Sequence, residues 1–198
     1  MDGNRRIEAV VIGASAGGVE AVCTLLAALP VPFGPAVVIL LHLLPGRHTA
    51  LPQLFSRYAP LPVKEAEDKE HIEGGRVYLA PPDYHLLVEP EKCFALSADE
   101  PHHFSRPSID LLFESAAYAY RDNLLAIVLT GASSDGAAGL QAVRGLHGMA
   151  WVQDPTEANV SVMPDAALAL AGADRVLSLK DMSDALNQLN QLDQQNYG

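Results

Sequence analysis

The sequence predicts an α/β protein built on a mostly parallel sheet, and two observations lead to this fold class. Apolar runs of strand length recur along the chain, and most of them alternate with segments of helical periodicity. Between residues 74 and 96, short strand-like runs instead follow one another with only the turns Pro81-Pro82-Asp83 and Glu89-Pro90-Glu91 between them. A small antiparallel excursion on the edge of the parallel sheet explains this segment.

The individual elements follow from these patterns in order along the chain. Strands of the main sheet are expected at Ala9–Ile12, Ala36–Leu41, Val77–Leu79, Ala126–Leu129, Ala150–Val152 and Val176–Leu179. The excursion is expected at Gly74–Leu79, His85–Val88 and Cys93–Leu96. Helices are expected at Val19–Leu29, Thr49–Tyr58, Ser108–Tyr120, Ala137–Leu146 and Pro164–Leu170, with a polar final helix near Met182–Leu192. The charged segment Lys64–Glu73 is expected to be a solvated loop or edge.

Composition limits the class of protein. The chain has 198 residues, 49% of them hydrophobic, which suits one domain spanning residues 1–198. A net charge of −11 argues against nucleic acid as a partner, since phosphate binding needs a basic surface. The two cysteines, Cys23 and Cys93, form no disulfide framework, and the sequence holds no leader pattern or apolar run of membrane-spanning length. A soluble protein of the reducing cytoplasm, without membrane insertion, is expected.

Ser15 stands among small residues, between Gly13 and Gly18, where an apolar strand must turn into a helix. The spacing satisfies the G-x-S-x-G pattern of a nucleophile elbow, in which backbone N–H groups at the helix start can hold developing negative charge. A serine here can equally be the N-cap of the helix, and both interpretations stay open. Nucleotide binding is disfavoured, because Val19-Glu20 stand where a P-loop needs Lys-Ser/Thr, and the next strand ends without the acidic residue of a dinucleotide site.

Two further polar residues follow predicted strands. His42 comes directly after Ala36–Leu41, and Asp135 follows Ala126–Leu129 through a short loop. The carboxyl ends of parallel strands gather at one edge of a sheet, so these residues are expected near Ser15. His42 would then remove the serine proton, and Asp135 would orient the imidazole. Taken singly, His42 also fits the polar end of a buried strand, and Asp135 fits the N-cap of the following helix.

Longer motifs run in order from about residue 7 to residue 180: Val11–Ala21, His42 with Pro45-Gly46, Val63–Asp68, Val77–Pro81, Arg106–Phe113, Leu129–Gly131, Asp135–Leu140, Gln153-Asp154 and Met163-Pro164. Together these motifs resemble the catalytic domain of CheB-type protein-glutamate methylesterases. The resemblance implies a doubly wound sheet and hydrolysis of glutamate γ-methyl esters on chemoreceptor helices, often with deamidation of receptor glutamines. It places the nucleophile at Ser15, the base at His42 and the orienting acid at Asp135, and it implies no metal or organic cofactor.

The resemblance also implies partners and further site residues. Members of the family usually carry a receiver domain before the catalytic domain, whereas here the first strand lies close to the start of the sequence. A catalytic domain without a receiver domain, controlled by a separate receiver protein or a fused domain, is therefore expected. The residues expected at the oxyanion and substrate sites are Ala16, Ala132, His85 and Met163. The adjacent pair His102-His103 lacks the spacing of a metal site and is expected in a surface loop.

Several positions depart from the family pattern. Ala16 stands where threonine is usual, and Ser133 replaces a glycine in the loop before Asp135. Leu43-Leu44 in the motif that begins at His42 differ as well. Two other functions therefore stay open: a binding module that recognises receptor helices or signalling proteins without turnover, and a serine esterase with a non-receptor substrate.

Overall fold

A seven-stranded parallel sheet forms the centre of the molecule. The computed structural model describes residues 6–42, 50–102 and 105–195. The strands are β1 (Ala9–Ala14), β2 (Ala36–Leu41), β3 (Val63–Glu65), β4 (Val77–Leu79), β7 (Leu124–Val128), β8 (Met149–Gln153) and β9 (Arg175–Leu177), in the spatial order β3-β4-β2-β1-β7-β8-β9. All neighbouring strands of this sheet pair in parallel. The strand order reverses at β1, which has β2 on one side and β7 on the other, so the crevice where α/β proteins bind ligands falls at the carboxyl end of β1.

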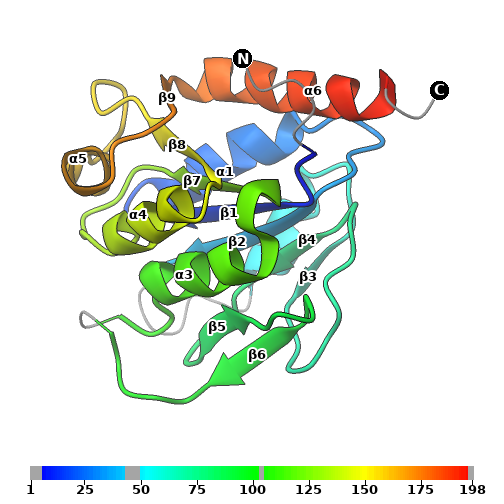
Figure 1. Ribbon diagram of the computed structural model, residues 1–198. Coiled ribbons are helices and arrows are strands. Elements are labelled where there is room, and N and C mark those ends of the chain that lie inside the picture. The colour runs from blue at the N-terminus through cyan, green and yellow to red at the C-terminus, as the bar shows by residue number, and fades with distance from the viewer. Residues whose placement is uncertain (1–5, 43–49, 103–104, 196–198) are drawn as a thin grey trace.

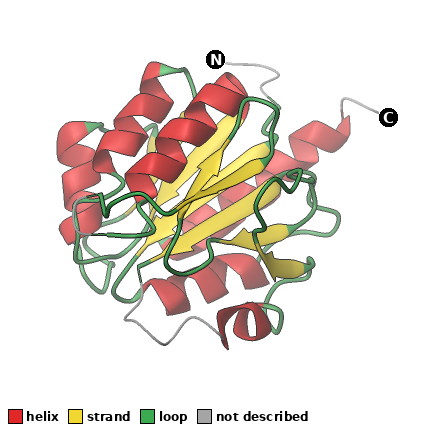
Figure 2. Cartoon of the chain, turned by 90° about the horizontal axis from the view of Figure 1, so that it is seen from below, coloured by secondary structure: helices red, strands yellow, loops and turns green. Residues whose placement is uncertain are grey.

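Helices cover both faces of the sheet (Figures 1 and 2). The first face carries α1 (Gly18–Ala27), α2 (Leu51–Phe55) and α6 (Leu179–Gln195). The second carries α3 (Ile109–Tyr120), α4 (Ala137–Gly145) and α5 (Val162–Leu170), and a short 3-10 turn at Arg121–Asn123 links α3 to β7. Alternate strand residues enter the two cores, so the central strands are apolar along their whole length, as a sheet covered on both faces requires. The predicted α/β class and the doubly wound arrangement are confirmed.

The antiparallel excursion is confirmed for its last two strands, but they form a separate layer, and its expected first part, Gly74–Leu79, is wrong because β4 pairs in parallel with β2 and β3 in the main sheet. Strands β5 (His85–Val88) and β6 (Phe94–Ser97) form a two-stranded antiparallel sheet of their own. This sheet packs against α3 rather than extending the main sheet, as Figure 1 shows. Apolar side chains of both strands, Leu86, Val88 and Phe94, are buried in the core beneath α3.

Three differences from the sequence-based expectation go beyond small shifts of an element's ends. The charged segment Lys64–Glu73, expected as a solvated loop or edge, overlaps the edge strand β3, where Lys64 and Glu65 suit a strand with one unpaired side. Helix α2 is shorter than predicted, and the expected start at Thr49 lies outside the described residues. The last strand ends at Leu177, because the Ser178 hydroxyl accepts a hydrogen bond from the Asp181 N–H and starts α6 there. Among the described residues, no helix is both long and apolar enough to cross a bilayer.

Candidate active site

Ser15 lies in the tight turn between β1 and α1. Its N–H donates to the Thr130 carbonyl at the end of β7 (3.0 Å), and its own carbonyl accepts from the Gly18 N–H (2.8 Å). The N-cap of α1 is Gly17, which has a positive φ of 78° and offers no side chain to cap the helix. The alternative that Ser15 is the N-cap therefore does not fit this geometry. Its half-buried side chain stands at the crevice where the strand order reverses.

His42 lies beside this turn. Its backbone N–H donates to the Ala14 carbonyl (3.0 Å), which continues the pairing of β2 with β1 and places the histidine next to the turn that contains Ser15. The ring Nε2 lies 2.9 Å from Asp135 Oδ2, although its N–H direction is not that of a hydrogen bond. Catalytic hydrogen bonds are commonly poorly aligned before substrate binds. Because Nε2 faces the acid, Nδ1 is the ring nitrogen left to accept a proton from another group.

Asp135 is buried, and its carboxylate caps a different helix from the one that the sequence suggested. Its carboxylate accepts hydrogen bonds from the Ser108 hydroxyl (3.0 Å) and from the backbone N–H groups of Ile109 (2.7 Å) and Asp110 (2.9 Å). The N-cap of α4, the helix that follows Asp135, is Gly136 without a side-chain bond. The interpretation of Asp135 as the N-cap of its own helix is therefore wrong, because its carboxylate satisfies the first N–H groups of α3 instead.

These contacts set the charge of Asp135. Burial raises its pKa, but the His42 imidazole and the N–H groups of Asp110 and Ile109 outweigh burial and lower the pKa to about 2. The carboxylate therefore keeps its negative charge at neutral pH. An ionised carboxylate beside the imidazole is what a serine hydrolase needs to stabilise the imidazolium that forms as the serine loses its proton.

The lowered pKa of Asp135 has a consequence for folding. A carboxyl group with a lower pKa in the folded than in the unfolded state stabilises the fold above about pH 4 and loses that contribution as the pH falls toward 2. We expect wild type to lose about 2 kcal/mol more stability than Asp135→Asn between pH 5 and pH 2. Urea unfolding of both proteins across this range measures the difference, and parallel pH profiles would contradict the ion-pair role.

Thr130 fixes the turn that contains Ser15 and Ala16. It is buried, and its carbonyl accepts from the Ser15 N–H. Its hydroxyl donates to the Ala16 carbonyl (2.9 Å) and accepts from the Val160 N–H (2.9 Å). The neighbouring Gly131 must be glycine, since a Cβ there would lie 2.9 Å from the Ser15 Cβ. The end of β7 therefore fixes both residues of the turn that would carry the reaction.

Removing the Thr130 hydroxyl tests whether its hydrogen bonds hold the turn at Ser15. In Thr130→Val, the Ala16 carbonyl and the Val160 N–H lose a buried partner, which costs about 1–3 kcal/mol per unsatisfied group. We expect kcat for ester hydrolysis to fall about tenfold or more, with KM little changed, because the turn loses its geometry. Thr130→Ser keeps the hydroxyl and is the matched control. Equal kcat in the valine and serine variants, measured on folded protein, would contradict the role.

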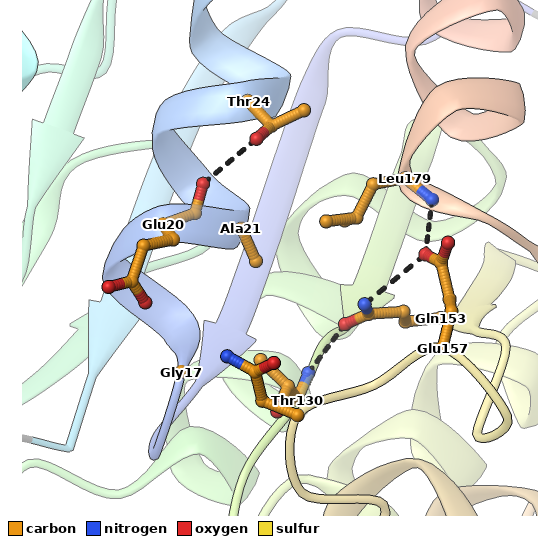
Figure 3. Close-up of a pocket in the computed structure, with 9 residues that line it drawn as sticks. Gly17, Glu20, Ala21, Thr24, Thr130, Gln153, Glu157 and Leu179 are labelled. Carbon is orange, nitrogen blue, oxygen red and sulfur yellow. Dashed lines mark hydrogen bonds between the residues drawn. The ribbon is translucent and has the colours of Figure 1, made fainter.

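A small hollow of about 150 Å³ lies behind the same turn (Figure 3). Gln153 at its floor accepts from the Thr130 N–H through Oε1 (2.8 Å) and donates through Nε2 toward Glu157 (3.3 Å). Glu157 in turn accepts from the Leu179 N–H at the start of α6. Sequence patterns did not reveal these contacts. The contacts of Gln153 with Thr130 and of Glu157 with Leu179 each join residues more than twenty positions apart in the sequence. The contact between Gln153 and Glu157 forms only in the folded state.

The other expected site residues fall into two groups. Ala16 and Ala132 are exposed on the loops after β1 and β7. Met163 is buried, its N–H donates to the Gly131 carbonyl, and its sulfur and methyl group pack over Gly131, so it supports the loop. The expectation that His85 lies at the substrate site is wrong. His85 is fully buried, its Nδ1 accepts from the Ser108 N–H (3.2 Å) and its Nε2 bonds the Glu100 carbonyl (3.1 Å). No face of His85 remains for substrate, and it positions Ser108 instead.

His102 lies closer to the acid than a surface loop would place it. Its Nδ1 is 3.4 Å from the Ser108 hydroxyl, and ligand atoms of His102, Asp110 and Asp135 lie within 4.8 Å of one another. The Asp135 oxygens already face His42, Ser108 and two backbone N–H groups, so we assign this cluster to the hydrogen-bond network around the acid. Its sequence neighbour His103, and the altered Leu43-Leu44 after His42, lie outside the described residues.

Comparisons with known proteins agree on one family. A family model described as CheB methylesterase matches residues 10–186. A putative protein-glutamate methylesterase/protein-glutamine glutaminase of Leptospira interrogans is 45% identical over 184 residues, covering 93% of this chain and 95% of the relative. Protein-glutamate methylesterase/protein-glutamine glutaminase 3 of Burkholderia lata is 39% identical over 177 residues, which are 88% of this chain but 48% of that relative, so the chain spans about half of its length. The crystal structure of the Thermotoga maritima CheB methylesterase catalytic domain superposes with a TM-score of 0.87 at 32% identity, covering 92% of this chain and 98% of the other.

Proposed function

Because the chain belongs to the CheB methylesterase family, we propose that it hydrolyses glutamate γ-methyl esters on the cytoplasmic helices of chemoreceptors by a serine mechanism. The observation that carries this proposal is the pair of His42 and the buried Asp135, whose Nε2 and Oδ2 atoms lie 2.9 Å apart, beside the turn that contains Ser15. All three residue types needed for nucleophilic hydrolysis are kept at the carboxyl edge of adjacent strands.

The first half of the reaction forms an acyl-enzyme. The Ser15 Oγ attacks the ester carbonyl carbon while His42 takes the serine proton, and Asp135 stabilises the resulting imidazolium. The ester carbonyl oxygen becomes an oxyanion, for which the N–H groups of Ala16 and Ala132 are the proposed donors. The carbon–oxygen bond to the methoxy group then breaks, and His42 returns the proton so that methanol leaves.

The second half releases glutamate. Water attacks the acyl-enzyme carbonyl, His42 takes a proton from the water, and the bond to Ser15 breaks with return of that proton to the serine. A glutamine side chain in place of the ester would release ammonia by the same steps, and the relatives that are named protein-glutamine glutaminases support this second substrate. No step needs a metal or organic cofactor. Control of the activity by a receiver protein or domain is part of the proposal.

The test is release of labelled methanol from receptor-containing membranes whose glutamates carry labelled methyl esters. Release by the wild-type protein above the level of heat-denatured protein is the expected result. Folded protein that binds the membranes without releasing methanol, even with an activated receiver protein added, would instead identify a binding module. Hydrolysis of small aryl esters without receptor demethylation would identify an esterase with another substrate.

A further inference from the structure

Two buried aspartates cap each other's helices. Asp135 precedes α4, but its carboxylate accepts from the Ile109 and Asp110 N–H groups at the start of α3 (2.7 and 2.9 Å). Asp110 lies in the first turn of α3, but its Oδ1 accepts from the Gly136 and Gly139 N–H groups at the start of α4 (2.8 and 2.7 Å). Each helix start thus has its free N–H groups and its positive dipole end satisfied by a carboxylate from the other segment.

The exchange depends on a close approach of the two helices. A Cβ on Gly139 would lie 2.8 Å from the Asp110 carbonyl oxygen and 2.7 Å from the Phe113 Cβ, so only glycine allows this contact. Both aspartates are almost fully buried, with 2% of Asp110 and 1% of Asp135 exposed. The first turns of α3 and α4 therefore pack directly against each other, and neither carboxylate faces solvent.

The two carboxyl groups also meet each other. A carboxyl oxygen of each lies within 4.8 Å of the other. Burial and the charge of Asp135 raise the pKa of Asp110, whereas His42 and the α3 N–H groups keep Asp135 ionised. Of the two carboxyl groups, Asp110 therefore holds a proton more readily.

We propose that Asp110 is a positioning residue for Asp135: the exchanged caps hold the Asp135 carboxylate toward His42. Asp110 itself touches neither the nucleophile nor the base in any described contact, so it acts through Asp135. This inference rests on the proposed serine mechanism for its catalytic meaning. A role in folding alone is the competing explanation.

Two substitutions at Asp110 separate these explanations. Asp110→Asn keeps an oxygen to accept from Gly136 and Gly139, whereas Asp110→Ala removes that acceptor. Asp174→Ala is the matched control, because Asp174 also accepts from a buried backbone N–H, that of Ala150 (2.7 Å), but at the opposite edge of the sheet. The readouts are kcat and KM for p-nitrophenyl acetate, thermal unfolding, and the ring ¹⁵N resonances of His42.

We expect Asp110→Asn to keep kcat within about threefold of wild type and Asp110→Ala to lower it about 10- to 100-fold with KM little changed. The His42 ring resonances should move in Asp110→Ala and stay near the wild-type values in the other two variants. Asp174→Ala should lower the unfolding temperature and leave kcat unchanged.

The proposal is overturned if folded Asp110→Ala keeps wild-type kcat and His42 resonances, or if the asparagine and alanine variants lose activity equally. Failure of the proposed function gives a different result. Wild type would then release no methanol from methylated receptors, while aryl-ester turnover and the His42 resonances still report on Asp110. If wild type hydrolyses no ester at all, the His42 resonances alone decide.

Discussion

Replacing Ser15 by alanine is expected to lower methanol release from methylated receptors by about 10⁴- to 10⁶-fold, to the level left by the oxyanion donors and binding alone. The substitution removes one hydroxyl from a turn whose geometry depends on the backbone, since Ser15 is held through its N–H and carbonyl. The fold and the affinity for receptor should therefore be unchanged. Methanol release and receptor sedimentation, measured on the same preparations, test both statements.

A neighbouring serine provides the control for this experiment. Ser134 is exposed on the loop before Asp135 and bonds the start of α4 only through its carbonyl, which accepts from the Ala137 N–H (3.2 Å). Ser134→Ala should keep wild-type turnover and should still react with a serine-directed fluorophosphonate, whereas Ser15→Ala should not. Residual turnover of Ser15→Ala above about 1% of wild type would remove Ser15 from the role of nucleophile.

Replacing His42 by glutamine is expected to have an effect of similar size, a loss of about 10⁴-fold in kcat or more. Glutamine can keep a polar contact with Asp135 but cannot accept the serine proton, so the hydroxyl loses its base. The backbone N–H of residue 42 still bonds Ala14, and the strand pairing around the turn should be retained. Fluorophosphonate labelling of Ser15 should slow in parallel with ester hydrolysis.

His71→Gln is the matched control, because His71 is exposed and lies in an isolated bridge with Cys93, outside the site. It should keep full activity. If His42→Gln retained more than a tenth of wild-type kcat while correctly folded, another group would have to supply the base, and the pairing of His42 with Asp135 would be structural.

The location of the site was predictable because it depends on local rules. A β-branched run, a Gly-rich turn and a helical face identify the β1–α1 junction, and the carboxyl ends of parallel strands bring His42 and Asp135 to the same edge. The fold class followed from the same alternation. The edge strand β3 was not recognised as a strand because two of its three residues, Lys64 and Glu65, carry charge and its pairing with β4 is set by the rest of the sheet.

The environment of the acid was not predictable, because it depends on contacts distant in sequence. Asp135 caps α3 rather than α4, and Asp110 caps α4, only because Gly139 lets the two helices approach. The family resemblance placed His85 at the substrate site, yet its partners, Ser108 and Glu100, enclose it from segments 23 and 15 residues away. Such pairings are fixed by packing, and no periodicity in the sequence encodes them.

The central position of β1, β2 and β7 has a consequence for local stability. These three strands supply the loops with Ser15, His42 and Asp135, and each is flanked by strands on both sides and by helices on both faces. Opening them exposes both cores, so their local opening free energy approaches that of global unfolding, whereas β3 and β9 at the rims can fray at much lower cost. Fluctuations of β3 and β9, and substitutions in these two strands, therefore have little effect on the relative positions of Ser15, His42 and Asp135.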